Sequence, residues 1–169
     1  MRSSLVAVLL VTSLTALPAA ADETMATLKP EQIGQIFCFS RLGNDEGAIE
    51  GILSPDLETA IADASSKNDA WETANPGEKP PLGDGIPWQA WPDYAAECSV
   101  GFVTLMKTDA RVEISCGFPE SADAHFTDTL LLKRVDMPDY GNSFWRIDNI
   151  AYATGSDLKA TLLAAFEGL

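Results

Sequence analysis

The stretch CSVGFVTLMKTDARVEISCGF, residues 98–118, decides the fold class of this chain. Apolar and polar residues alternate over Ser99–Met106 and again over Arg111–Phe118, a period of two that is typical of half-buried β-strands. The residues between them, Lys107–Ala110, have the length and composition of a hairpin loop. The stretch therefore predicts an antiparallel β-hairpin.

The register of this hairpin follows from the apolar residues on its two strands. We expect Val100 to lie opposite Ile114. Phe102 would then lie opposite Val112, on the same face. These four side chains, together with Met106 at the end of the first strand, are predicted to share one side of the hairpin.

The chain has three cysteines, which allow one internal disulfide and leave one thiol. The hairpin register puts Cys98 opposite Cys116, so a bond between neighbouring strands is one possibility. A bond from Cys38 to Cys98 closes a longer loop, worth about 4 kcal/mol against roughly 3 kcal/mol for the shorter one. We favour Cys38–Cys98, because it joins elements that the hairpin does not already connect. Cys116 would then be a buried thiol without a catalytic role.

Helical patterns precede the hairpin. Thr27–Leu42 carries an apolar face at helical spacing, and a short helical turn is expected over Ala48–Leu53. Ser54 followed by Pro55 is a typical helix start, with a capping hydroxyl and a proline in the first turn. The breakers of Asn75–Gly77 end this longer helix.

Two more strands follow the hairpin, over Phe126–Val135 and Ser143–Tyr152, and a last helix begins at a cap on Ser156. Helices first, antiparallel strands after them and one closing helix make an α+β domain. We expect residues 22–169 to form a single domain of this class, with the helices packed on an antiparallel sheet of about four strands.

The segment NPGEKPPLGDGIPWQAWPD, residues 75–93, has neither helical nor strand period and reads as a loop. Its two tryptophans are too apolar to be left wholly in water, so the loop is expected to lie against the domain. Aromatic rings with a few placed carboxylates are what typically line a ligand pocket. The candidate ligand-contacting residues are therefore Asp84, Trp88, Trp91, Asp93 and Tyr94. The same sequence is also expected if Asp84 only forms a turn and the tryptophans only fasten the loop to the sheet.

Other titratable residues give weaker signals. His125 precedes a strand, and Asp128 would point to the opposite face, so the two are not expected to form a catalytic dyad. Arg146 and Asp148 share a face at two-residue spacing, which favours an ion pair or cross-strand pair over a catalytic acid. No set of His, Cys and carboxylates has metal-ligand spacing, so neither a metal nor a cofactor is predicted.

Residues 1–21 have the pattern of a secretory signal peptide. Arg2 supplies a charge, Leu5–Leu17 is almost wholly apolar, and small residues follow, so we expect cleavage after Ala21 and a periplasmic or secreted protein. No later apolar run is long enough to cross a bilayer, so no membrane insertion is expected after cleavage. The net charge of −14 argues against nucleic acids and anionic membrane surfaces as partners.

Three segments carry a family resemblance: WRIDNIAYATGSDLKATLLAAF at residues 145–166, LSPDLETAIADASSKNDAW at residues 53–71 and PPLGDGIPW at residues 80–88. They resemble small exported bacterial domains of unknown function close to the nuclear transport factor 2-like (cystatin-like) superfamily. The resemblance implies a cone of helices wrapped by a strongly curved antiparallel sheet, often with a pocket at the open end. The chain lacks the acid–base set of the catalytic members, so no activity carries over.

These observations favour a non-enzymatic module that binds a small molecule, or an accessory module for another periplasmic protein. Its pocket would lie between the sheet, the helices and the tryptophan-bearing loop. One alternative is an isomerase or hydrolase that uses Asp84, Asp93 or Asp148 as a base in that pocket. The other is a protein-interaction module that uses an exposed face of the sheet.

Overall fold

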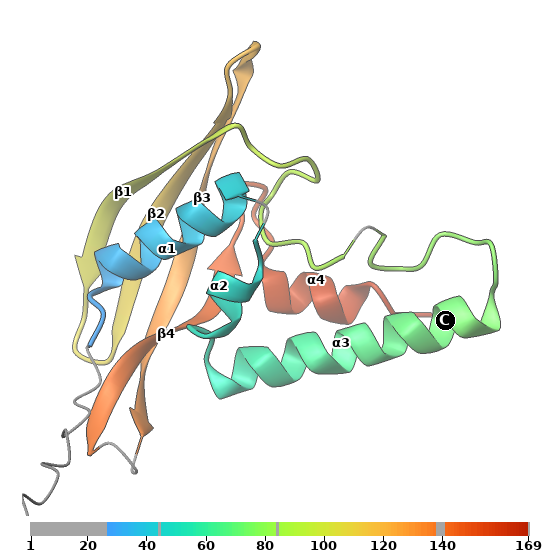
Figure 1. The fold of residues 1–169 in the computed structure, drawn as a ribbon, viewed down its shortest axis with the longest axis horizontal. Coiled ribbons are helices and arrows are strands. Elements are labelled where there is room, and N and C mark those ends of the chain that lie inside the picture. Colours follow the sequence, from blue (N-terminus) through green and yellow to red (C-terminus); the bar gives the residue numbers. More distant parts are fainter. Residues whose placement is uncertain (1–26, 44, 84, 138–140, 169) are drawn as a thin grey trace, which may run out of the picture.

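The computed structural model describes residues 27–168 apart from residues 44, 84 and 138–140, and leaves out the side chains of residues 122 and 123. The predicted signal peptide and its cleavage site lie outside the described residues. The elements run in the order α1 (Pro30–Gly43), α2 (Gly47–Glu50), α3 (Pro55–Ala74), β1 (Glu97–Leu105), β2 (Asp109–Phe118), β3 (Ser121–Met137), β4 (Asn142–Ala151) and α4 (Leu158–Ala164) (Figure 1). The predicted α+β class, with its antiparallel sheet and closing helix, is confirmed.

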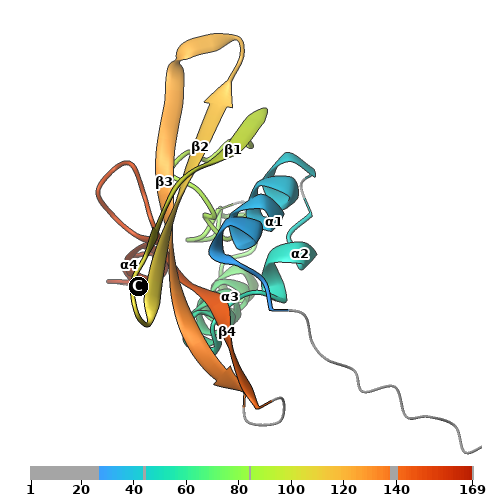
Figure 2. The ribbon, with the colours of Figure 1, turned by 90° about the vertical axis from the view of Figure 1, so that its left-hand side faces the viewer.

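The four strands form one antiparallel sheet in the order β1-β2-β3-β4, so each strand pairs with its neighbour in sequence. Each of the three pairings contains a register shift, and such bulges increase the twist of a sheet. Figure 2 shows the strands twisting along their length, with α1 and α2 on one side of the sheet. No helix among the described residues is both long and apolar enough to span a bilayer.

One of the two residue pairs predicted for the hairpin is confirmed, and the other is wrong. Val100 lies opposite Ile114, but a bulge follows, and Val103 rather than Phe102 pairs with Val112. Phe102 is 82 % exposed, and the prediction that it lies opposite Val112 is wrong. A bulge inserts one extra residue and reverses the faces of the residues after it, which simple alternation does not reveal.

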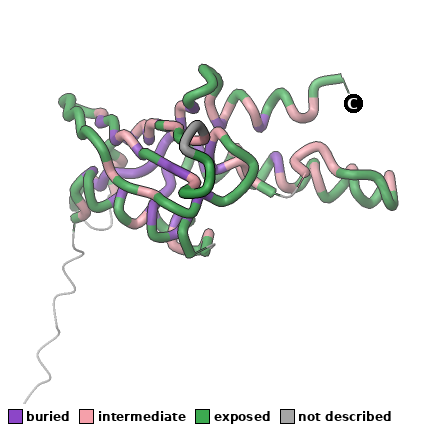
Figure 3. The backbone as a smooth tube through the Cα atoms, turned by 90° about the horizontal axis from the view of Figure 1, so that it is seen from above, coloured by how far each residue is buried: buried purple, intermediate pink, exposed green. Residues whose placement is uncertain are grey.

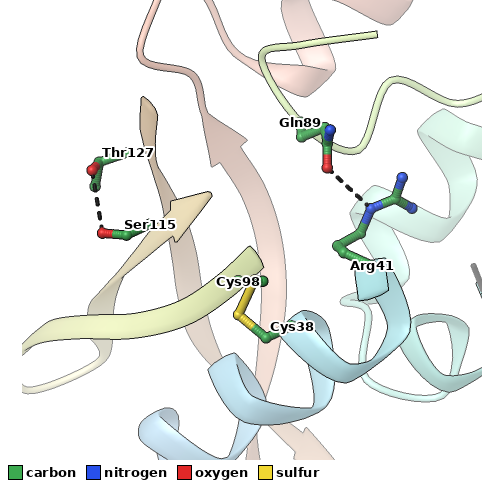
Figure 4. Close-up of a disulfide and its surroundings, with 6 residues drawn as sticks. All are labelled: Cys38, Arg41, Gln89, Cys98, Ser115 and Thr127. Atoms are coloured by element: carbon green, nitrogen blue, oxygen red, sulfur yellow. Dashed lines mark hydrogen bonds between the residues drawn. A yellow bond between two sulfur atoms is a disulfide. The ribbon is translucent and has the colours of Figure 1, made fainter. Parts of the chain in front are cut away.

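Helix α1 is fastened to this hairpin by the disulfide between Cys38 and Cys98, with 5.3 Å between their Cα atoms (Figure 4). The predicted pairing is confirmed, and Cys116, which lies opposite Cys98 in the sheet, is a buried free thiol. Gly34 brings α1 close to the sheet, because a Cβ atom there would lie 2.8 Å from Cγ1 of Val112. Only a glycine permits this approach without a shift.

The core lies between the sheet and the helices. Its largest fully buried apolar side chains are Ile33, Phe37, Ile49, Leu57, Val112, Ile114, Leu130, Leu132, Ile147, Ile150 and Leu158. Figure 3 shows the buried residues gathered over the sheet, whereas the end that carries the C-terminus is mostly intermediate or exposed. In α3, accordingly, only Leu57 and Ala64 are buried.

The caps of two helices decide where they start. Ser54 caps α3 as predicted, and its Oγ accepts a hydrogen bond from the Leu57 amide at 3.1 Å. Helix α4 is capped by Asp157 and not by Ser156, since Oδ1 of Asp157 accepts from the Ala160 amide at 2.8 Å. The predicted start was therefore one residue early, because a carboxylate caps as well as a hydroxyl does.

Candidate functional site

Three segments that are far apart in sequence surround one hollow of about 440 Å³. They are the end of α1 with the turn after it, the loop that precedes β1, and the segment from the end of β4 into α4. We call this space the tryptophan-loop hollow. Its lining residues are Arg41, Glu46, Lys79, Leu82, Gly83, Gly85, Ile86, Pro87, Trp88, Gln89, Ala90, Trp91, Pro92, Tyr94, Tyr152, Thr154, Ser156 and Thr161.

Of the five predicted ligand-contacting residues, Trp88, Trp91 and Tyr94 line this hollow. Trp88 is only 3 % exposed, whereas Trp91 and Tyr94 are 48 % and 46 % exposed. The ring of Trp91 also packs against Phe118, with 6.3 Å between the ring centroids. Three aromatic rings from a single loop therefore come together, one inside the core and two at the surface.

The two predicted carboxylates are not seen at the hollow. Asp84 lies outside the described residues. Asp93 is exposed and is not among the described lining residues, although its backbone oxygen accepts a hydrogen bond from the side chain of Gln89. Among the described lining residues, Glu46 is the only carboxylate.

Arg41, at the end of α1, is a lining residue that the sequence did not single out. Its residue exposure is 5 %, and its guanidinium group lies 4.6 Å from the ring centroid of Tyr94. Its polar contacts with described side chains are both long: Nε donates to Oε1 of Gln89 at 3.5 Å (Figure 4), and Nη1 lies 3.5 Å from Oε1 of Glu46. A guanidinium group carries five N–H donors, so donors remain for a further acceptor. Arginine near a helix end is common, so no local signal marked this one.

Asp128 holds two walls of the hollow to the sheet. It lies on β3 and is 1 % exposed, and its two oxygens accept hydrogen bonds from the amides of Ala90 at 2.8 Å and Ala153 at 2.9 Å. Burial raises the pKa of Asp128 in spite of these two bonds, which favour the charged form. The sequence does carry a signal for this residue: an acid falls on the same strand face as Leu130 and Leu132, which are buried.

Further bonds fasten the loop. The Tyr152 hydroxyl donates to the backbone oxygen of Pro87, and burial raises the pKa of this phenol above its ordinary value. The indole Nε1 of Trp88 is buried and has no hydrogen-bond partner among the described residues. A buried donor of this kind costs about 1–3 kcal/mol of stability. The loop is therefore tightly held, yet it retains one donor that folding leaves unused.

Asp148 forms a separate charged cluster on β4. It accepts from the Ser54 hydroxyl at 2.9 Å, and its oxygens lie 2.8 Å from Nζ of Lys133 and 3.3 Å from Nζ of Lys159. Burial alone would raise the pKa of Asp148, but the bonds from Lys133 and Ser54 and the charge of Lys159 outweigh it and lower the pKa. The partner across the strands is Lys133, whereas Arg146 stacks over Phe144. Asp148 is not among the described residues that line the tryptophan-loop hollow.

His125 lies inside β3, which begins at Ser121, and not before the strand as predicted. Its ring covers Gly117 on the neighbouring strand, where a Cβ atom would come within 2.3 Å of Nδ1. His125 and Asp128 differ in exposure as the strand period predicts: the histidine is exposed and the aspartate is buried.

Within the described part of the chain, no group of three or more His, Cys, Asp and Glu side chains is arranged to hold a metal ion. The chemistry of the hollow comes from aromatic surface, hydroxyl groups, the buried guanidinium group of Arg41, the carboxylate of Glu46 and the ammonium group of Lys79. No family model matches the chain, and neither a curated protein nor a solved structure shows a significant similarity to it.

Proposed function

We propose that this chain is an exported, non-enzymatic module that binds a small organic molecule in the tryptophan-loop hollow. The volume of about 440 Å³ falls within the range of small-molecule sites. The walls come from three segments that Asp128, the disulfide and the loop bonds hold in place. A site that is held before its ligand arrives loses less entropy on binding.

The observation that carries the proposal is the position of Trp91 and Tyr94. Both rings line the hollow and remain about half exposed, beside the buried guanidinium group of Arg41. Apolar ring surface that stays in water is stabilised when a ligand covers it. The hollow therefore suits a molecule with a flat apolar face and with oxygen acceptors that reach Arg41.

The test is calorimetry of the purified chain against amino acids, sugars, nucleosides and aromatic carboxylates. We expect at least one probe to bind, and Trp91→Ala and Tyr94→Ala to weaken it about tenfold each. The control is Phe102→Ala, which removes an exposed ring from β1 and should leave the affinity unchanged. A set of probes that all fail to bind, or equal losses in the control, would overturn the proposal.

The same proposal places the chain near the nuclear transport factor 2-like superfamily, as a cone with the hollow at its open end. The twisted four-stranded sheet with α1 and α2 on one side supports this placement. Export to an oxidising compartment is supported by the disulfide, which is rarely stable in a reducing one.

The alternatives from the sequence gain less support. A carboxylate-based reaction in the hollow would have to use Glu46 among the described lining residues, and that acid is paired with Arg41. A protein-interaction function would use the apolar side chains exposed on and after β1: Phe102, Leu105 and Met106. Two of these, Leu105 and Met106, instead line a second hollow at the other end of α1.

A further inference from the structure

We propose a second binding site, for a small organic anion with an apolar body, at the opposite end of α1 from the tryptophan-loop hollow. The space measures about 500 Å³ and lies between the start of α1, the end of β1 and the start of β4. We call it the basic hollow. Its lining residues are Thr27, Leu28, Lys29, Pro30, Leu105, Met106, Lys107, Arg134, Asn142, Ser143 and Trp145.

The charges of the basic hollow are of one sign. Lys29, Lys107 and Arg134 line it, and the described lining residues include no carboxylate. None of the three forms an ion pair with a described residue, whereas Lys133 and Lys159 both pair with Asp148. The full chain has 25 acidic and 11 basic residues, so three cations that line one hollow without an ion pair to any described acid are unexpected.

Like charges that converge on one hollow repel each other, and this repulsion is relieved when an anion enters. Arg134 is already oriented: its Nη1 donates to Oγ of Ser143 at 3.1 Å, and its guanidinium group lies 4.8 Å from the ring centroid of Trp145. A guanidinium group held in this way keeps further donors for a carboxylate or phosphate, in the geometry that such anions prefer. The exposed Lys29 and Lys107 would add two further positive charges beside the same anion.

The other half of the hollow is apolar. Leu105 and Met106 are largely exposed, and Leu28 is half-buried. Apolar side chains beside uncompensated cations match a ligand that joins an acidic head to a hydrocarbon or aromatic body. A simple inorganic anion would use only the cations, so the apolar side chains separate the two classes of ligand.

The net charge of −14 opposes extended polyanions, because they would meet the acidic remainder of the surface. A small anion contacts only the basic hollow and therefore experiences less of this repulsion, which salt screens further. The shared chemistry is an acidic head on an apolar body, which either a free amphiphile or an anionic lipid in a bilayer could supply.

The experiment is calorimetry with dodecyl phosphate, kept monomeric, and with inorganic phosphate as the comparison. We expect saturable binding of dodecyl phosphate that is about tenfold or more tighter than that of inorganic phosphate. Its affinity should fall as NaCl is raised from about 20 to 200 mM, because exposed charges are screened. No saturable binding, or equal affinity for the two probes, would overturn the proposal.

Variants locate the site. Lys107→Glu and Arg134→Gln should each weaken dodecyl phosphate about tenfold. The matched control is Lys67→Glu, an exposed lysine on α3 outside the basic hollow, which should change the affinity less than twofold. Leu105→Ser should weaken dodecyl phosphate and leave inorganic phosphate unchanged. Equal losses in Lys107→Glu and Lys67→Glu would show a general charge effect and overturn the site.

Two further experiments identify the source of the ligand and distinguish the basic hollow from the tryptophan-loop hollow. Vesicles of phosphatidylglycerol should bind no better than vesicles of phosphatidylcholine, since a bilayer would also meet the acidic surface. Binding to the anionic vesicles without binding to the free amphiphile would overturn the proposal in favour of a membrane surface. Trp91→Ala, which alters the tryptophan-loop hollow, should leave the affinity for dodecyl phosphate unchanged. A loss of affinity in this variant would show that dodecyl phosphate binds in the tryptophan-loop hollow and would overturn the proposal.

Discussion

The hydroxyl of Ser54 makes two hydrogen bonds at once. It accepts from the Leu57 amide as the cap of α3, and it donates to Oδ1 of Asp148 on β4. One side chain therefore fixes the start of a helix and ties it to the sheet. The neighbouring backbone bonds, from the Ser54 amide to Ile147 and from the Ile147 amide to Ile52, support the same junction.

The charge of Asp148 should stabilise the fold in a pH-dependent way. Its pKa is lowered from the ordinary value of 3.8, so the folded state holds this proton more weakly than the unfolded state does. The stabilisation is complete above that ordinary value and disappears as the pH falls through the lower pKa of the folded state. We expect Asp148→Asn to lower the free energy of unfolding at pH 7 by about 1–3 kcal/mol.

Urea unfolding of the wild type and Asp148→Asn across this pH range measures the effect. The difference between them should shrink as the pH falls below about 4. A difference that stays constant down to the lowest pH would mean that the amide disturbs packing and that the charge is unimportant.

At this scale, local pattern predicted the residues whose partners are encoded nearby or across one strand pair. The cap at Ser54 and a pair for Asp148 belong to this group. Arg41 does not, because its burial depends on a loop that folds over it from more than forty positions away in sequence. No spacing rule within α1 distinguishes it from an ordinary solvent-facing arginine.

Among the elements, α1 has the closest contact with the sheet. Replacing glycine by alanine inside a helix normally stabilises it by about 0.5–1 kcal/mol. At Gly34 we expect the opposite, a loss of about 1–3 kcal/mol, because the new Cβ would lie 2.8 Å from Val112 and 3.0 Å from Val100. Thermal unfolding measures the change. Gly43→Ala is the control, since nothing lies within 4 Å of a Cβ there, and it should not destabilise.

The disulfide adds a covalent link between the same two elements. It closes a loop with a sequence separation of 60, for which chain entropy predicts about 4 kcal/mol of stabilisation. Reduction, or the double variant Cys38→Ser and Cys98→Ser, should lower the free energy of unfolding by that amount in urea titrations. Cys116→Ala should leave the response to reductant intact, and a response that vanished in this variant would implicate the third cysteine in the bond.

The strands show what periodicity can and cannot predict. The hairpin and the pairing of Val100 with Ile114 follow from alternation, although β2 begins at Asp109 and so includes two residues of the predicted loop. The bulge that turns Phe102 outward does not, because one inserted residue leaves the apolar composition unchanged. Gly101 is the only local hint: it precedes Phe102 within the shift, and a Cβ there would lie 3.1 Å from Cβ of Glu113.

For the molecule as a whole, order of elements and fold class were predictable, because helices and strands occupy separate halves of the sequence. The two hollows were not, since each is closed by segments that meet only after folding. One wall of the first hollow was predictable, because the tryptophans in the loop of residues 75–93 indicate that this loop packs against the domain.

Export is the prediction that belongs to the full chain. When the gene product is expressed in a bacterium with a periplasm, mass spectrometry of the periplasmic fraction should find a chain that begins at Asp22. A protein that is retained in the cytoplasm with residues 1–21 intact would contradict this expectation. The same sample should carry the Cys38–Cys98 bond, which peptide mapping without reductant detects.

The amides of Ala90, which lines the tryptophan-loop hollow, and of Ala153, whose two chain neighbours line it, both donate to the carboxylate of Asp128. A ligand that changes the distance between these two segments alters the electrostatic field at that carboxylate. The pKa of Asp128, and therefore the fraction of molecules in which it is protonated, changes with it. Association at a pH close to the pKa of Asp128 would then exchange protons with the medium. Calorimetry repeated in buffers of different ionisation enthalpy would reveal this exchange as a buffer-dependent heat, even though Asp128 itself never touches the ligand.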